Sequence, residues 1–312
     1  MVVVSVPMIL DCDPGHDDAV AIAVAAHRGE LIGVTTVAGN VGIEHTTRNA
    51  LAILQLMGLD VPVHRGAAAP LAATGAELVH AAHVHGETGL AGAVLPEVTR
   101  TVASDDAVGY LLDATSTGGA WIVATGPLTN VALALQRDPE LAHRVAGISI
   151  MGGGTFGNVT AAAEFNINFD PEAADIVLRC GAARILMCGL DLTHQVAVDD
   201  ALVARLRGLG NEFGPFCAGF LDAYLDNVRT LTRRRDVAAL HDPCAVLAVT
   251  DPDLFAGARL PVAVETKGEH TRGMTLVDRR AWMRGHGNVE WAEHIDAGPA
   301  LDVVTASIAA AP

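Results

Sequence analysis

The chain has 312 residues, of which 51% are hydrophobic and 18% are charged, so it can bury a large core and is unlike a disordered protein. Acidic residues outnumber basic ones by 36 to 20, and the formal charge of −16 argues against nucleic acids and anionic membranes as partners. Length alone allows about two domains, but α/β folds of this size often form one unit, and we expect a single domain over residues 1–312.

The N-terminal apolar run, residues 2–10, leads directly into a cluster of acidic residues. It is too short to span a membrane and lacks the basic start of a signal peptide, so we predict a buried strand and a cytoplasmic protein. Similar runs at 31–37, 121–124, 148–151 and 185–188 alternate with helical patterns. The alternation predicts an α/β fold with an open, mostly parallel β-sheet flanked by helices.

Three dipeptides mark predicted helix starts, namely Gly126-Pro127, Asp170-Pro171 and Asp242-Pro243. Proline suits the first position of a helix, and an aspartate before it can cap the free backbone amides. We therefore expect Asp170 to be a helix cap. Residues 71–100 are predicted to form a long loop and a helix beside the site.

Polar residues collect where the predicted strands end, at residues 11–18, Asn40, Thr125 and residues 158–166. In open α/β sheets the ligand lies beyond the carboxyl ends of the strands. The sequence therefore predicts that these segments line one pocket.

Four carboxylates occupy the eight residues after the first strand: Asp11, Asp13, Asp17 and Asp18. Capping of the following helix explains one or two of them, and the rest need a compensating cation. No paired histidine or cysteine lies nearby, so hard oxygen ligands favour Ca²⁺ or Mg²⁺ over zinc. The five cysteines are scattered and are predicted to be buried free thiols.

The acidic segment, DCDPGHDD, resembles the N-terminal DxDPGxDD motif of the inosine-uridine type nucleoside hydrolases. Further similarity to this family follows in order along the chain, in VAGNVG around Asn40, HGETGL from His85, ATGPLTN around Thr125, MGGG from Met151, NVTAAAEFNINFDPEAA from Asn158 and HDPC from His241. The resemblance covers nearly the whole chain and implies a nucleoside hydrolase-like fold with a Rossmann-like core.

This resemblance implies hydrolysis of the N-glycosidic bond of a ribonucleoside, with Ca²⁺ as the cofactor. The implied calcium ligands are Asp13, Asp18, the main-chain carbonyl of Thr125 and Asp242. An all-oxygen shell of this kind is what Ca²⁺ prefers. Asp13 is implied to be the general base for the attacking water, and direct attack by water implies inversion at the anomeric carbon.

The resemblance also implies contacts to the substrate. The implied ribose contacts are Asp17 and Asn166 at the 2′-hydroxyl, Asp242 and Asn40 at the 3′-hydroxyl, and Asn158 and Glu164 at the 5′-hydroxyl. His241 is the candidate acid for the departing base, and His85 is a second contact to that base. Phe165 and Tyr224 are the aromatic candidates for stacking on the base. Nine other histidines, His194 among them, are expected to have no role in the site.

Some alternatives stay open at this point. The family contains enzymes for purine and for pyrimidine nucleosides, and the few aromatic residues leave the preferred base undecided. A Mg²⁺-dependent phosphatase of the haloacid dehalogenase type also begins with DxD, but Lys267 is the only lysine here to hold a phosphate. A non-catalytic nucleoside-binding or ribose-binding protein is the other alternative. Family analogy suggests a homodimer or homotetramer.

Overall fold

The computed structural model of the chain describes residues 5–72, 80–81, 84, 86–232 and 237–311, and an eight-stranded sheet lies at its centre. The strand order is β3-β2-β1-β4-β5-β6-β12-β9, in which only β9 runs antiparallel to its neighbour. This order confirms the predicted open, mostly parallel sheet. The strands of the sheet are β1 (Pro7–Cys12), β2 (Glu30–Thr36), β3 (Val63–Arg65), β4 (Trp121–Ala124), β5 (Gly147–Met151), β6 (Ile185–Cys188), β9 (Phe255–Leu260) and β12 (Val289–Ile295).

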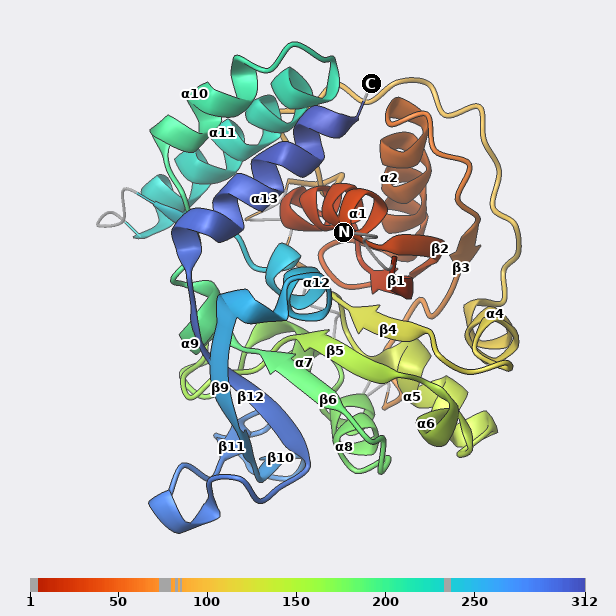
Figure 1. Cartoon of the computed structure of the whole chain (residues 1–312), viewed down its shortest axis with the longest axis vertical. Coiled ribbons are helices and arrows are strands. Elements are labelled where there is room, and N and C mark those ends of the chain that lie inside the picture. Colours follow the sequence, from red (N-terminus) through yellow and green to blue (C-terminus); the bar gives the residue numbers. More distant parts are fainter. Residues whose placement is uncertain (1–4, 73–79, 82–83, 85, 233–236, 312) are drawn as a thin grey trace.

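Helices cover both faces of the sheet (Figure 1). The helices of one layer are α1 (His16–Arg28), α2 (Ile43–Leu56), α12 (Pro243–Thr250) and α13 (Ala297–Ala310). The helices α10 (Asp200–Arg207) and α11 (Phe213–Thr232) belong to the same layer. The opposite layer consists of α4 (Ala107–Ala114), α5 (Thr129–Arg137), α6 (Leu141–Arg144) and α8 (Pro171–Leu178). Two short helices, α7 (Phe165–Phe169) and α9 (Leu190–Thr193), follow β5 and β6. Small two-stranded sheets pair β7 (Ala197–Val198) with β8 (Ala238–Ala239), and β10 (Val262–Val264) with β11 (Thr275–Val277).

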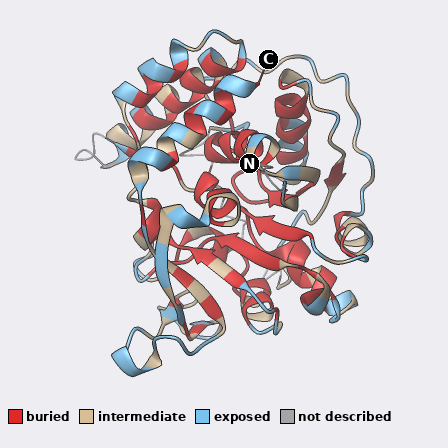
Figure 2. Ribbon diagram, viewed as in Figure 1, coloured by how far each residue is buried: buried red, intermediate tan, exposed pale blue. Residues whose placement is uncertain are grey.

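Burial on both faces explains why the central strands are continuous apolar runs. In β1, Met8 and Leu10 pack in the core beneath α1, whereas Ile9 points into the core on the other side of the sheet. Successive side chains of a strand point to opposite faces, so both sets must be apolar when helices cover both. Figure 2 shows the resulting buried centre, with exposed residues on the outer sides of the helices.

The observed helix starts agree with two of the three predictions. Pro171 and Pro243 are the first residues of α8 and α12. The third prediction was wrong, because α5 begins at Thr129 rather than at Pro127. Pro127 lies in the connection between β4 and α5, where its ring is the neighbour of Gly39, so this proline belongs to the loop beyond the carboxyl end of β4.

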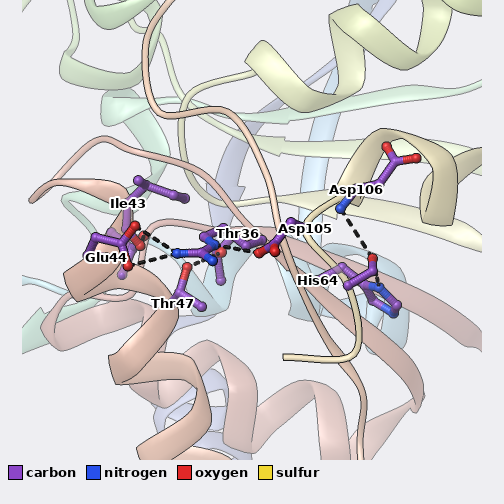
Figure 3. A network of polar contacts seen from close by, with 10 residues as sticks. Thr36, Ile43, Glu44, Thr47, His64, Asp105 and Asp106 are labelled. Carbon is purple, nitrogen blue, oxygen red and sulfur yellow. Dashed lines mark hydrogen bonds and ion pairs between the residues drawn. The ribbon is translucent and has the colours of Figure 1, made fainter. Parts of the chain in front are cut away.

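The predicted loop and helix at 71–100 is partly outside the described residues. Within 86–100 the chain forms turns and irregular structure, without helix or strand. Side chains fix the segment that follows to the sheet edge (Figure 3): Arg65 pairs with both Glu44 and Asp105, and His64 Nδ1 lies 2.8 Å from the Ser104 hydroxyl. These contacts hold the short edge strand β3 between α2 and the approach to α4.

All five cysteines are free, and four are buried, while Cys180 is half-buried. In the part of the chain that the structure describes, no helix is both long enough and apolar enough to cross a bilayer.

Candidate active site

The site lies at the carboxyl ends of β1 and β4, where the strand order changes direction. The chain leaves β1 towards β2 on one side and reaches β4 on the other side of β1. Such a switch point opens a crevice above the strand ends. The acidic segment after β1 and Thr125 after β4 therefore meet there, as the Thr125 N–H donates to the Asp11 carbonyl at 2.8 Å.

Asp11, the first acid of the motif, is a structural residue. Its Oδ1 accepts hydrogen bonds from the Thr35 hydroxyl at 2.6 Å and from Asn130 Nδ2 at 2.8 Å. Burial raises the pKa of Asp11 to about 6, against the opposing effect of these two donors. Asp11 is fully buried and joins β1 to β2 and α5.

Asp13 is held tightly by backbone. Its Oδ2 accepts from the Asn40 N–H at 2.6 Å, and Asn40 Nδ2 donates to the Asp13 carbonyl at 3.1 Å. Two glycines allow this approach, since a Cβ on Gly39 would collide with Asp13 Oδ2 and one on Gly126 would lie 2.5 Å from Oδ1. Burial and the charge of Asp18 raise the pKa of Asp13 well above its usual range.

Asp18 links three parts of the site. Its carboxylate accepts from the Gly15 N–H at 2.9 Å, from the Thr125 hydroxyl at 2.9 Å and from Asn40 Nδ2 at 3.3 Å. Burial raises the pKa of Asp18 to about 6, and the charge of Asp17 adds to this rise. The side chain therefore fixes the start of α1 against the ends of β2 and β4.

Asp242 comes from far along the chain but joins the same cluster. Oxygen atoms of Asp17, Asp18 and Asp242 lie within 4.8 Å of one another, and all three residues are buried. Burial, followed by the charges of Asp17, Asp18 and Asp13, raises the pKa of Asp242 well above its usual range. Although Asp242 precedes Pro243 at the start of α12, its side chain makes no capping hydrogen bond, so the carboxylate is available to the cluster.

The donor set fits a hard divalent cation. Within the described ranges no lysine or arginine forms an ion pair with these carboxylates, so no described basic residue offsets their repulsion. Buried like charges need protons or a cation to compensate them. Because the donors are oxygen atoms, Ca²⁺ or Mg²⁺ would suit the cluster better than a soft metal.

Asn166 and Glu164 form the side of the site next to β5. Asn166 Nδ2 donates to the Thr125 carbonyl at 2.8 Å and to the Met151 carbonyl at 3.1 Å. Glu164 caps α7: one carboxylate oxygen accepts from Asn166 N–H, and the other from the N–H groups of Gly153 and Ile167. Burial raises the pKa of Glu164, while these amides oppose the rise.

A cavity of about 380 Å³ opens over the cluster. Of the residues singled out in the sequence, eleven line it: Asp13, Asp17, Asn40, Thr125, Asn158, Glu164, Phe165, Asn166, Tyr224, His241 and Asp242. Asp18 lies beside this set through its bonds to Asn40 and Thr125. His85 lies outside the described residues. Small-molecule sites have volumes of roughly 300–1,000 Å³, so the cavity has the size of a small ligand.

The cavity also has aromatic and apolar lining residues, which together form its aromatic wall. Tyr224 is 5% exposed, and its hydroxyl donates to the Ala239 carbonyl at 3.0 Å. The Tyr224 ring lies 5.5 Å from the buried ring of His16. Phe165 is half-buried at the start of α7. The apolar side chains of this wall are Val84, Val159, Val228, Leu231 and Val237.

His241 projects into this cavity beside a histidine that sequence reasoning left out. The His241 and His194 rings have centroids 5.7 Å apart, and His194 also lines the cavity. Behind His241, the Thr193 hydroxyl lies 2.8 Å from Nδ1. Thr193 and His194 have no motif of their own, and only the position of α9 between β6 and β7 brings them to His241.

The chain is similar to known proteins in sequence and in fold. Residues 8–302 match the family described as inosine-uridine preferring nucleoside hydrolase. A pyrimidine-specific ribonucleoside hydrolase RihA from Shewanella woodyi is 44% identical over 308 residues, which cover 97% of either chain. The protein of the same name from Photobacterium profundum is 45% identical over 279 residues, covering 88% of this chain and 89% of that one. The solved structure of a purine-preferring ribonucleoside hydrolase from Gardnerella vaginalis is similar at a TM-score of 0.89 and 34% identity, over 97% of this chain and 98% of that one.

Proposed function

The chain belongs to the inosine-uridine preferring nucleoside hydrolase family, and on that premise we propose that it hydrolyses ribonucleosides with calcium as cofactor and with inversion at the anomeric carbon. It is a ribonucleoside hydrolase, a glycosidase that acts on N-glycosyl compounds. The observation that carries the calcium proposal is the buried oxygen cluster of Asp17, Asp18 and Asp242, which no basic residue neutralises in the described parts of the chain.

The residues that would hold calcium are Asp13, Asp18, Asp242 and the carbonyl of Thr125. Their support is chemical, because Asp13, Thr125 and Asp242 line the cavity, Asp18 lies beside them through its bond to Thr125, and the carboxylates repel one another without a cation. A bound divalent cation supplies the positive charge that orients water and makes it a stronger nucleophile.

Asp13 would act as the general base. Its Oδ2 is held by the Asn40 N–H, so the other carboxylate oxygen can take the proton of a water in the cavity. The negative cluster would also stabilise the positive charge that develops on the ribose as the glycosidic bond breaks. Direct attack by this water on the face of the ribose away from the departing base would give inversion.

The ribose would lie between the carboxylates and the amides. Asp17 and Asn166 are proposed for the 2′-hydroxyl, Asp242 and Asn40 for the 3′-hydroxyl, and Asn158 and Glu164 for the 5′-hydroxyl. Glu164 already accepts three backbone hydrogen bonds, so its contact with the ribose would use remaining lone pairs. A 5′-phosphate would meet this acidic wall, and nucleotides should be poor substrates.

The base would lie against the aromatic wall, near His241 and Tyr224. His241 is proposed to donate to the departing base, with Phe165 and His85 as further contacts. Two curated relatives at 44% and 45% identity are named pyrimidine-specific, whereas the purine-preferring structure is 34% identical. We therefore propose uridine or cytidine as the preferred substrate.

The testing experiment measures free ribose from uridine, cytidine, inosine and adenosine, with added calcium and with a chelator. We expect release with calcium, loss with the chelator, and faster release from the pyrimidine nucleosides. NMR of the first product should show α-ribose from the β-nucleoside. Equal rates in both metal conditions would exclude calcium dependence, and initial β-ribose would exclude inversion.

The two alternative functions are not favoured. The phosphatase predicts phosphate release from a phosphate ester, and the non-catalytic binding protein predicts tight nucleoside binding without turnover. The same ribose assay, with a phosphate assay beside it, distinguishes all three. For assembly, family analogy leads us to propose a homodimer or homotetramer, which light scattering on the purified chain would test.

A further inference from the structure

Thr193 supports His241 from outside the cavity. It is the last residue of α9, is fully buried, and its N–H donates to the Gly189 carbonyl at 3.0 Å. The Thr193 hydroxyl lies 2.8 Å from His241 Nδ1. Of these two residues only His241 lines the cavity, so Thr193 contacts the ring at Nδ1 from outside the cavity.

The direction of this hydrogen bond follows from burial. The bond to His241 is the only side-chain hydrogen bond of Thr193 among the described residues. If Nδ1–H donated, the Thr193 hydroxyl hydrogen would be buried without an acceptor, which is costly. If the hydroxyl donates instead, only one of its lone pairs lacks a partner. The second arrangement is favoured, and it makes Nδ1 the acceptor.

We propose that Thr193 is a positioning residue that fixes the tautomer of His241, so that the hydrogen of the neutral ring is on Nε2. This inference rests on the proposed function, because it assigns the atom with which His241 meets the departing base. A neutral imidazole has one N–H and one bare nitrogen, and the hydrogen bond at one nitrogen sets the state of the other. Nε2–H can donate to a carbonyl oxygen of a pyrimidine, whereas a bare Nε2 would repel it.

The mutational test compares Thr193→Val, which removes the hydroxyl at nearly constant volume, with Thr193→Ser, which keeps it. For the valine variant we expect kcat on uridine to fall about tenfold, the equivalent of one lost hydrogen bond, with little change in KM. Turnover of p-nitrophenyl riboside should fall much less, because its leaving group needs no donor. The serine variant should restore turnover of uridine.

Thr305→Val is the matched control. Thr305 is a buried threonine of α13 whose hydroxyl donates to the Leu301 carbonyl, far along the chain from the site. Its loss should leave both substrates unaffected. Equal loss on uridine and on p-nitrophenyl riboside in Thr193→Val would assign Thr193 a purely structural role and overturn the proposal. So would a serine variant that behaves like the valine variant.

An NMR measurement tests the tautomer without any turnover. In protein labelled with ¹⁵N in its histidine rings, at about pH 8 where imidazole is neutral, we expect His241 to show an unprotonated Nδ1 and a protonated Nε2. The His241 signals are identified by their loss in His241→Gln. The reverse assignment would overturn the proposal. The expected tautomer in a protein that hydrolyses no nucleoside would instead contradict the proposed function and leave the role of Thr193 intact.

Discussion

Asp13 and Asp11 stand two residues apart in the same motif, but their surroundings differ. Asp13 lines the cavity, with one oxygen fixed by the Asn40 N–H. Asp11 lies below it, with Oδ1 shared by Thr35 and Asn130. A pattern of acids along the chain does not reveal this difference, because it depends on which neighbours the strands bring to each carboxylate.

Asp13→Asn should keep the fold and lose most of the activity. The amide oxygen can still accept from the Asn40 N–H, but the NH₂ group in place of the second oxygen cannot take a proton from water. We expect kcat on uridine to fall by about 10²- to 10⁴-fold, the usual contribution of a general base. Steady-state kinetics and a melting curve measure the two effects.

Asp11→Asn is the control for this substitution. Asparagine keeps one acceptor for both Thr35 and Asn130, so kcat should change by no more than a few fold. If the Asp11 variant were the inactive one and the Asp13 variant turned over normally, the general base would be misassigned.

At the scale of the elements, two Asp-Pro pairs look alike in sequence and differ in the structure. Asp170 caps α8 through the Ala173 N–H at 3.0 Å, and its other oxygen accepts from Leu71 N–H and the Thr129 hydroxyl. Asp242 begins α12 without a side-chain cap and faces the acidic cluster. The prediction that Asp170 is a cap is confirmed.

Asp170→Ala should therefore lower stability, and Asp242→Ala should lower activity. Loss of a cap costs about 0.5–2 kcal/mol, and the buried Thr129 hydroxyl would add to that cost. Removal of Asp242 takes one charge from a repelling cluster. With calcium chelated, Asp242→Ala should therefore unfold at a temperature no lower than that of the wild type. Denaturation curves and turnover of uridine, measured on both variants, check these two expectations. An Asp170 variant that loses activity but not stability, with an Asp242 variant that loses stability but not activity, would exchange the two roles.

The turn after β2 depends on close packing that side chains would prevent. A Cβ on Gly39 would strike the Asp13 carboxylate, whereas one on Gly42, three residues later, meets nothing within 4 Å. We expect Gly39→Ala to reduce kcat at least tenfold by displacing Asp13, and Gly42→Ala to have little effect. Uridine turnover by the two variants measures this, and equal activities would show that the turn can adapt.

The sequence predicted the central strands and the pocket segments because these are local signals. Continuous apolar runs at 121–124 and 185–188 match β4 and β6. The strands β9 and β12 were missed because their burial alternates irregularly, and β12 pairs with β6 about 100 residues earlier in the chain. His194 and Thr193 were missed for the same reason, since their contacts with His241 exist only in the folded chain.

For the whole molecule, the buried acids link stability to pH and to metal. Burial raises the pKa of both Asp11 and Asp18 to about 6, from an ordinary value of 3.8, and raises those of Asp13, Asp17 and Asp242 as well. An acid with a raised pKa binds its proton more tightly in the folded state than in the unfolded one. The stability it contributes is present below pH 3.8 and is lost as the pH rises through about 6.

Without metal, these buried acids should therefore lower the melting temperature as the pH rises from about 4 to 7. Surface acids that pair with arginine, such as Glu172 and Asp200, have lowered pKa values and act in the opposite direction. The contribution of these surface acids to stability is the same with and without calcium. The difference between the two melting curves therefore reports the contribution of the buried acidic cluster. Because calcium binds ionised carboxylates, its stabilising effect should grow with pH over this range.

Scanning calorimetry at several pH values, with chelator and with calcium, measures this difference directly. Asp18→Asn is the informative variant, since it removes a cluster charge while its amide oxygen can still accept from Gly15 N–H. It should melt higher than the wild type in chelator near pH 7 and gain less from calcium. A calcium effect that is absent near pH 7, or that is equal in the wild type and the variant, would mean that the buried acids hold no cation.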